Sequence, residues 1–229
     1  MCNLYSNTMP PAAMRQLFAV DPANDRLGNA EPQPAIFPKT MSPIVGVGSD
    51  GARWLENAHW GFVLPQVSKK TGKPIQPKAV NNARDDKLRN SRFWAKSFEE
   101  RRCLIPATSY CEPKGRNPAT YVWFGVVGVE ERPPFALAGI WRHYNGNYGG
   151  EEREMITSSM VTTMPNALTR QTHPDRSPAI LDPEDYEQWL TGTPDQAFAL
   201  IRPFPAARMV IHQSGEGLKA DRGGLSDAI

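Results

Sequence analysis

The sequence of 229 residues lacks the features that mark several large protein classes. Its three cysteines, at positions 2, 103 and 111, form no C-x-x-C pair and have no pair of histidines nearby, which disfavours a disulfide framework and a zinc finger. The longest apolar run, Tyr121 to Val129, has nine residues, whereas a membrane-spanning helix needs about 20. The opening MCNLYSNTMPP has neither the basic nor the apolar region of a signal peptide. We therefore expect a protein of the reducing cytoplasm, with no membrane and no metal.

The chain also lacks a strong overall charge, since its net charge is only +2. Apolar residues make up 40% and charged residues 22%, which is an ordinary globular balance and not that of a disordered chain. The 22 prolines disfavour a helical bundle, because proline ends helices. At roughly 100–200 residues per domain, the length predicts one domain over 1–229, with its core at 2–213 and a loose tail at 214–229.

Segments rich in Val, Ile, Thr and aromatic residues, bounded by Gly, Pro and Asn, are typical of β-strands. Such segments lie at 44–47, 60–64, 103–108, 121–129, 135–141, 155–163 and 208–212. Apolar spacing and capping residues predict helices at 10–20, 166–171, 183–190 and 195–201. The mixture predicts a β-rich α+β domain.

The small net charge hides a basic stretch. From Lys69 to Arg102 there are eleven Lys and Arg against four Asp and Glu, a net +7 that leaves −5 for the rest of the chain. Clustered cations favour binding to phosphates, and Phe93 and Trp94 within the stretch are of the kind that stack on exposed bases. A solvated loop with ordinary charge explains the same pattern, so both interpretations stay open at this point.

Cys2 is the most reactive feature of the sequence. Methionine aminopeptidases remove Met1 when residue 2 is small, and Cys2 would then carry a free α-amine (pKa about 7.7–8.0) next to a thiol (pKa about 8.5). This 1,2-aminothiol condenses with an aldehyde to an imine, on which the thiol closes to a thiazolidine ring. Two other interpretations are an incidental, hydrophobic terminal cysteine and an N-terminal nucleophile hydrolase.

Five sequence blocks follow one another in order. They are MCNLYS at the start, WGFVLP at 60–65, NNAR at 81–84, RCLIPATSYCEP at 102–113 and HPDRSPAIL at 173–181. In this combination the sequence resembles the SRAP family, the SOS-response-associated peptidases or abasic-site processing proteins. The resemblance implies a barrel-like core of mixed or antiparallel sheets with peripheral helices. It also implies a monomer without cofactor or metal that binds single-stranded DNA, or a junction of single- and double-stranded DNA.

The activity implied by the resemblance is a reversible thiazolidine link between the N-terminal cysteine and the ring-opened aldehyde of an abasic site. Carried over by position, Cys2 is the crosslinking residue, Asn82 holds the cysteine and the sugar, Glu112 is the family's acidic residue, and His173 is its histidine. The expected DNA contacts are Arg84, Lys78, Trp60 and Arg176. A tryptophan in a strand such as Trp60 is, however, more often part of the core.

The expected chemistry divides among these side chains. Glu112 would take the ring hydroxyl proton, His173 would donate a proton to the leaving oxygen, and Asn82 would position the nucleophile and the sugar. Taken singly, Glu112 fits an acid at the end of a surface strand and His173 fits a loop histidine, so their roles depend on the joint pattern. The sequence departs from the family at Leu4, where arginine is common, which removes one expected phosphate contact.

Overall fold

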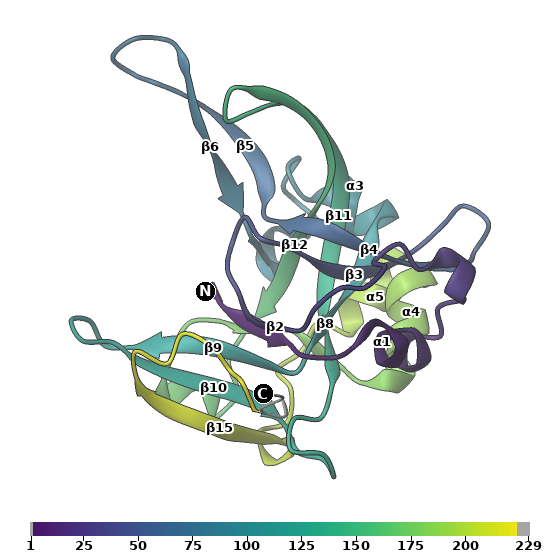
Figure 1. Cartoon of the computed structure of the whole chain (residues 1–229), viewed down its shortest axis with the longest axis vertical. Helices are drawn as coiled ribbons and strands as arrows, with labels where there is room; N and C mark the ends of the chain where they lie inside the picture. Colours follow the sequence, from purple (N-terminus) through teal and green to yellow (C-terminus); the bar gives the residue numbers. More distant parts are fainter. Residues whose placement is uncertain (1, 224–229) are drawn as a thin grey trace.

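The computed structural model of the chain describes residues 2–223 and has an α+β architecture dominated by strands (Figure 1). The strands are β1 (Tyr5–Asn7), β2 (Gln33–Ile36), β3 (Met41–Val47), β4 (Arg53–Trp60), β5 (Phe62–Val67), β6 (Pro74–Val80), β7 (Asn82–Arg84), β8 (Arg102–Ala107), β9 (Ser109–Lys114), β10 (Thr120–Val126), β11 (Phe135–Tyr148), β12 (Glu151–Thr163), β13 (Ser177–Pro178), β14 (Ile180–Leu181) and β15 (Met209–Glu216). The predicted β-rich α+β class is confirmed.

Short helices complete the fold. The α-helices are α1 (Pro11–Phe18), α2 (Asp85–Leu88), α3 (Ala95–Glu100), α4 (Tyr186–Thr191) and α5 (Pro194–Ala199), and the 3-10 helices are η1 (Pro22–Asn24), η2 (Thr169–Gln171), η3 (Pro183–Asp185) and η4 (Ala206–Arg208). The helices predicted at 10–20, 183–190 and 195–201 are therefore present. The one predicted at 166–171 is reduced to the single turn of η2.

The strands form two larger sheets and one hairpin. An antiparallel five-stranded sheet has the order β15-β10-β9-β1-β2. An eight-stranded sheet runs β13-β12-β4-β3-β8-β11-β14 with β7 added beside β12, and it is mixed because β12 pairs in parallel with β4 and β7. The hairpin of β5 and β6 projects from the body next to the long β11–β12 hairpin (Figure 1).

A hydrophobic core lies between the two larger sheets. Tyr5, Tyr110 and Phe124 contribute from the five-stranded sheet, and Ile44 and Leu137 from the eight-stranded one. Because successive side chains of a strand point to opposite faces, both sheets bury one set of residues here. The predicted barrel-like core is confirmed.

The helices cover the other face of the eight-stranded sheet. Phe18 of α1, Phe98 of α3 and Trp189 of α4 are all fully buried and belong to a second core with Val45 and Leu104 of that sheet. The helices are thus peripheral, as predicted, and they leave the space between the sheets free to accommodate the start of the chain.

The predicted strand at 60–64 is interrupted. β4 ends at Trp60 and β5 begins at Phe62, because Gly61 between them has φ of +129°, a conformation that favours glycine. A Cβ at Gly61 would also lie 2.5 Å from the Cβ of Ala79 on β6. The glycine therefore lets the chain leave the large sheet and start the projecting hairpin.

The tail predicted to be loose from residue 214 is ordered in its described part. β15 continues to Glu216, and Asp221 is buried, accepting a hydrogen bond of 2.6 Å from the Ser109 hydroxyl and pairing with Arg132 at 2.9 Å. A buried carboxylate needs such partners, and they fasten the tail to β9. Residues 224–229 of the predicted tail lie outside the described residues. Within residues 2–223, no helix is long and apolar enough to cross a membrane.

Candidate active site

Cys2 lies at the edge of the core between the two sheets. β1 pairs with β9 through Tyr5 opposite Tyr110, and the Leu4 carbonyl accepts a hydrogen bond of 2.9 Å from the amide of Cys111, which extends the pairing toward the chain start. The Cys2 side chain is fully buried, with its sulfur 3.3 Å from the Leu4 carbonyl oxygen. The pairing of a terminal strand inside the sheet thus fixes the position of Cys2.

Two neighbouring asparagines hold the backbone of Cys2. Asn82 Nδ2 donates to the Cys2 carbonyl oxygen at 2.7 Å, and Asn81 Nδ2 donates to the same oxygen at 3.1 Å. Asn82 is fixed by β7, where it lies opposite Met160 of β12, and the Asn81 carbonyl accepts from the Trp60 indole at 3.1 Å. Both bonds go to the carbonyl group, so they leave the amino nitrogen of Cys2 outside the clamp.

Asn82 retains a second polar group for the site. Its Oδ1 atom is buried and accepts no hydrogen bond from any of residues 2–223. A buried amide oxygen without a donor costs free energy that a bound donor recovers. Asn82 therefore presents an acceptor next to the residue that it clamps.

Glu112 of β9 adds a buried carboxyl group to the site. It is 1% exposed, and burial raises its pKa to about 7, an effect that the positive charge of the amino terminus opposes. The pKa of the Cys2 thiol is raised well above its ordinary value. Burial is the main cause, and the negative charge of Glu112 is the second. At neutral pH the site therefore combines a protonated thiol with a carboxyl group that is close to its midpoint.

His173 follows η2 and is partly buried. Its Nδ1 accepts a hydrogen bond of 3.2 Å from the backbone amide of Arg176. Burial lowers its pKa, and the positive amino terminus lowers it further, so the imidazole is neutral at pH 7. The charge of Glu112 acts on the Cys2 thiol, so the fold brings these two side chains into one electrostatic environment.

Arg84 and Arg176 lie side by side on two aspartates but differ in exposure. Arg176 donates to Asp85 Oδ1 and, at 2.8 Å, to Asp86 Oδ1, and only 8% of it is exposed. Arg84 is exposed and donates from Nε and Nη2 to Asp86 at 2.9 and 2.8 Å. The expectation that Arg176 contacts DNA is therefore corrected, because its guanidinium is buried and paired, whereas Arg84 stays accessible.

Removing the Arg176 charge should destabilise the fold. In Arg176→Leu, Asp85 loses its buried partner, and we expect the free energy of unfolding to fall by roughly 2–4 kcal/mol, as is usual when one member of a buried ion pair is removed. Urea unfolding measures this effect. Arg84→Leu is the matched control and should change stability little, because exposed pairs contribute little. Equal stability of Arg176→Leu and the wild type would contradict the structural role.

Three aromatic residues that the sequence offers for DNA binding pack into the core. Trp60 is an expected DNA contact, and Phe93 and Trp94 are candidates for stacking on bases. Trp60 is fully buried and packs edge-on against Tyr5 with ring centroids 4.8 Å apart, so its indole has no free face for a base. Trp94 is 7% exposed, and Phe93 is covered by Arg142 at 4.5 Å from its ring centroid. Trp60 and Trp94 therefore offer no free ring face to a base in this conformation, Phe93 is partly buried, and the core interpretation of Trp60 agrees with its burial.

The basic stretch does not form one face. Arg102 is buried and donates to the carbonyl oxygens of Trp189 and Phe98, and Arg89 lies over the Phe198 ring and pairs with Asp195 at 2.7 Å. The lysines of the β5–β6 hairpin, in contrast, are exposed: Lys69, Lys70, Lys73 and Lys78. The stretch thus divides into structural arginines and a group of accessible lysines, to which the predicted contact residue Lys78 belongs.

Sequence reasoning missed three residues that shape the site. Asn81 shares the clamp on Cys2, while Asp85 and Asp86 fix the two arginines. The available signal was their position, because Asn81 and Asp85 directly flank the Asn82–Arg84 segment and Asp86 follows next. Within the described part of the chain, no cluster of three His, Cys, Asp or Glu is placed to hold a metal.

Fold and site together define a class: a β-rich domain with a buried cysteine at position 2 next to a carboxyl and an amide group. The sequence model of the SOS response associated peptidase (SRAP) family matches residues 1–217. The chain belongs to this family. It is 30% identical over 173 residues to "Abasic site processing protein YoqW" of Bacillus subtilis (strain 168), covering 74% of this chain and 72% of the relative.

Further relatives agree with this membership. "Abasic site processing protein YobE" of the same strain is 29% identical over 173 residues, which are 74% of either chain. Among solved structures, a protein from Bordetella bronchiseptica superposes with a TM-score of 0.72 at 23% identity, covering 94% of this chain and 99% of that one. A protein from Bacteroides thetaiotaomicron reaches 0.67 at 21% identity, covering 94% and 91%. At these identities, the structural neighbours establish the fold.

Proposed function

We propose that the protein processes abasic sites in single-stranded DNA by forming a thiazolidine between Cys2, freed of Met1, and the ring-opened abasic aldehyde. The observation that carries the proposal is the clamp of two asparagine amides on the Cys2 carbonyl, next to a carboxyl group with a pKa of about 7. The names of the curated relatives as abasic site processing proteins support it. DNA as a partner also fits the reducing compartment expected from three unpaired cysteines.

The first step is opening of the sugar. An abasic deoxyribose is mostly a closed hemiacetal, and removal of its hydroxyl proton releases the aldehyde. Glu112 fits the role of base because a pKa of about 7 leaves part of the carboxyl ionised at neutral pH. The neutral imidazole of His173 accepts or relays a proton, and it donates only in its minor cationic form.

The second step forms the ring. The α-amine of Cys2 adds to the aldehyde carbon, and the carbinolamine, whose hydroxyl takes a proton from the protonated Glu112 carboxyl, loses water to give an iminium ion. The thiol then adds to the same carbon, and its proton passes to the Glu112 carboxylate, which leaves a neutral thiazolidine. Because the raised pKa keeps the thiol protonated until this step, the amine reacts first. The free Asn82 Oδ1 fits the N–H of the reacting amine.

DNA binding rests on exposed cations. Arg84, with its planar fork, suits a phosphate next to the site, and Lys78 with the other lysines of the β5–β6 hairpin provides positive charge farther away. This arrangement replaces the aromatic stacking expected from the sequence. We propose that the strand enters between the hairpin and the clamp on Cys2.

A hydrolase with Cys2 as its nucleophile is less well supported. Nucleophilic cysteines have a depressed pKa, whereas burial raises the pKa of Cys2. The family description as a peptidase therefore carries less weight for this chain than its site chemistry.

A denaturing gel with modified oligonucleotides tests the proposal. We expect a shifted, covalent band with a single-stranded oligonucleotide that contains an abasic site, and no band with a tetrahydrofuran analogue, which has no hemiacetal to open. Intact mass should show that Met1 is absent from the reactive protein. Absence of the band with the abasic oligonucleotide, or an equal band with the analogue, would contradict the proposal.

A further inference from the structure

The face of the five-stranded sheet that carries Glu112 continues beyond the site. Glu112, Val122 and Ser214 lie opposite one another on β9, β10 and β15, and the next row toward the β9–β10 turn contains Lys114 and Thr120. Residues two apart on a strand share a face. Lys114 therefore projects from the same side of the sheet as Glu112.

A cavity of about 400 Å³ lies on this face. Its lining is formed by Lys114, Thr120, Val122, Leu168, Gln171, Thr172, Ile211 and Ser214. It lies beside both acid–base groups of the site, because Val122 is the cross-strand neighbour of Glu112, and Thr172 directly precedes His173. A strand that passes the site on this face therefore runs toward the cavity.

The chemistry of the lining fits one nucleotide. Lys114 is an exposed cation, the threonine and serine hydroxyls are hydrogen-bonding groups, and Val122, Leu168 and Ile211 supply apolar surface, of which Ile211 is 43% exposed. A phosphate requires the cation, and a sugar or base requires the apolar surface. Sites for ligands of this size measure about 300–1,000 Å³.

We propose that this cavity binds the nucleotide that flanks the abasic site on one side of the same DNA strand, with Lys114 on its phosphate. The inference rests on the function proposed above and assigns a second subsite to it. It gives the enzyme a contact with an intact neighbour, which the abasic sugar, having no base, cannot supply. The subsite therefore selects a lesion inside a strand over a free abasic sugar.

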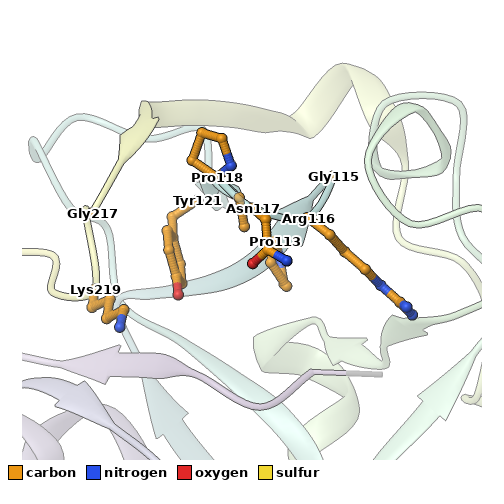
Figure 2. Close-up of a pocket in the computed structure, with 9 residues that line it drawn as sticks. Pro113, Gly115, Arg116, Asn117, Pro118, Tyr121, Gly217 and Lys219 are labelled. Carbon is orange, nitrogen blue, oxygen red and sulfur yellow. The ribbon is translucent and has the colours of Figure 1, made fainter.

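A second cavity offers a contrast. It measures about 670 Å³ and is lined by Tyr121, Arg116 and Lys219 among others (Figure 2). Tyr121 lies opposite Pro113, one position out of phase with Glu112, so this cavity is on the other face of the sheet. Lys219 lies there with its ammonium 5.9 Å from the centroid of the Tyr121 ring. Lys219 is an exposed cation near the β9–β10 turn, but it lies on the face of the sheet opposite Glu112. It is therefore a matched control for Lys114.

The test compares Lys114→Ala and Lys219→Ala on three single-stranded oligonucleotides, with the abasic site internal, at the 5′ end or at the 3′ end. The measurement is the crosslinking rate at subsaturating protein. With the internal lesion, we expect Lys114→Ala to be about five- to tenfold slower and its logarithmic salt dependence to be less steep by about 0.7, the value for one phosphate contact on a single strand. Lys219→Ala should match the wild type.

The terminal lesions give the decisive comparison. One of the two terminal lesions lacks the nucleotide that the cavity binds. The wild type should crosslink to this oligonucleotide more slowly than to the internal lesion. On this oligonucleotide, Lys114→Ala and the wild type should react at the same rate. An unchanged rate of Lys114→Ala on the internal lesion, or an equal loss on all three oligonucleotides, would overturn the subsite. Absence of any crosslink with the wild type would instead overturn the proposed function, so the two failures are distinguishable.

Discussion

Cys2→Ser is expected to abolish the covalent band with abasic DNA while leaving the fold and DNA binding intact. Serine keeps the α-amine, which still forms an imine, but its hydroxyl is a much poorer nucleophile than sulfur, so the stable five-membered ring does not accumulate. The two asparagines bind the backbone carbonyl of residue 2, which the substitution does not change. Serine also permits removal of Met1. The denaturing gel measures the covalent band, circular dichroism measures the fold, and a binding assay measures the affinity for DNA.

Borohydride separates the roles of amine and thiol. Reduction traps an imine, so we expect Cys2→Ser to regain a covalent band only when borohydride is present. Cys111→Ala, which removes a neighbouring buried thiol on the opposite face of β9, should keep the wild-type band without a reductant. A stable band from Cys2→Ser in the absence of borohydride would disprove the thiazolidine.

The proximity of Cys2, Asn82 and Glu112 was predictable from the family resemblance and not from any local pattern. Cys2, Asn82 and Glu112 come from strands that are far apart in sequence, and their union requires β1 to pair with β9 and β7 to pair with β12. Such pairing carries no local signal that composition alone detects. The family resemblance supplied it, and the structure gives the geometry.

The exposure of individual charges was not predictable. Arg84 and Arg176 look alike in sequence, yet one is exposed and the other is buried on Asp85 and Asp86. A charge count treats the two equally, since burial is decided by tertiary contacts. For the same reason the sequence does not reveal that the basic stretch divides, with Arg102 as a buried donor to backbone carbonyls.

Several strands escaped the sequence patterns, and β4 and β6 show two physical reasons. β4, with the sequence RWLENAHW, has buried residues on both faces, so it shows no alternation of polar and apolar residues. β6 contains two prolines and a lysine, which are uncommon in strands, and it is tolerated because it pairs only with β5. Strand detection by pattern fails where both faces or neither face is buried.

Glu112→Gln should slow crosslinking by about 10²-fold or more, within the range that general acid–base groups contribute. Glutamine has the same shape, but it takes up no proton from the sugar hydroxyl or from the thiol. The wild-type rate should rise between pH 6 and 8 as the carboxyl, with its pKa of about 7, and the α-amine lose protons. In the variant, only the rise due to the amine should remain. Single-turnover rates over this pH range measure both effects, and Glu99→Gln, an exposed acid, is the control.

The same substitution should make the protein more stable at neutral and higher pH. Burial raises the pKa of Glu112 in the folded state, so the unfolded chain loses this proton first, and stability is lost as pH rises from about 4.3 to about 7. Glutamine does not ionise, so at pH 8 we expect Glu112→Gln to gain about 3–4 kcal/mol over the wild type and at pH 4 almost nothing. Urea unfolding at the two pH values measures the difference. If Glu112 is a catalytic carboxyl whose burial costs stability, the Glu112→Gln variant should be slower and more stable than the wild type. If Glu112 only supports the fold, the variant should lose both crosslinking rate and stability.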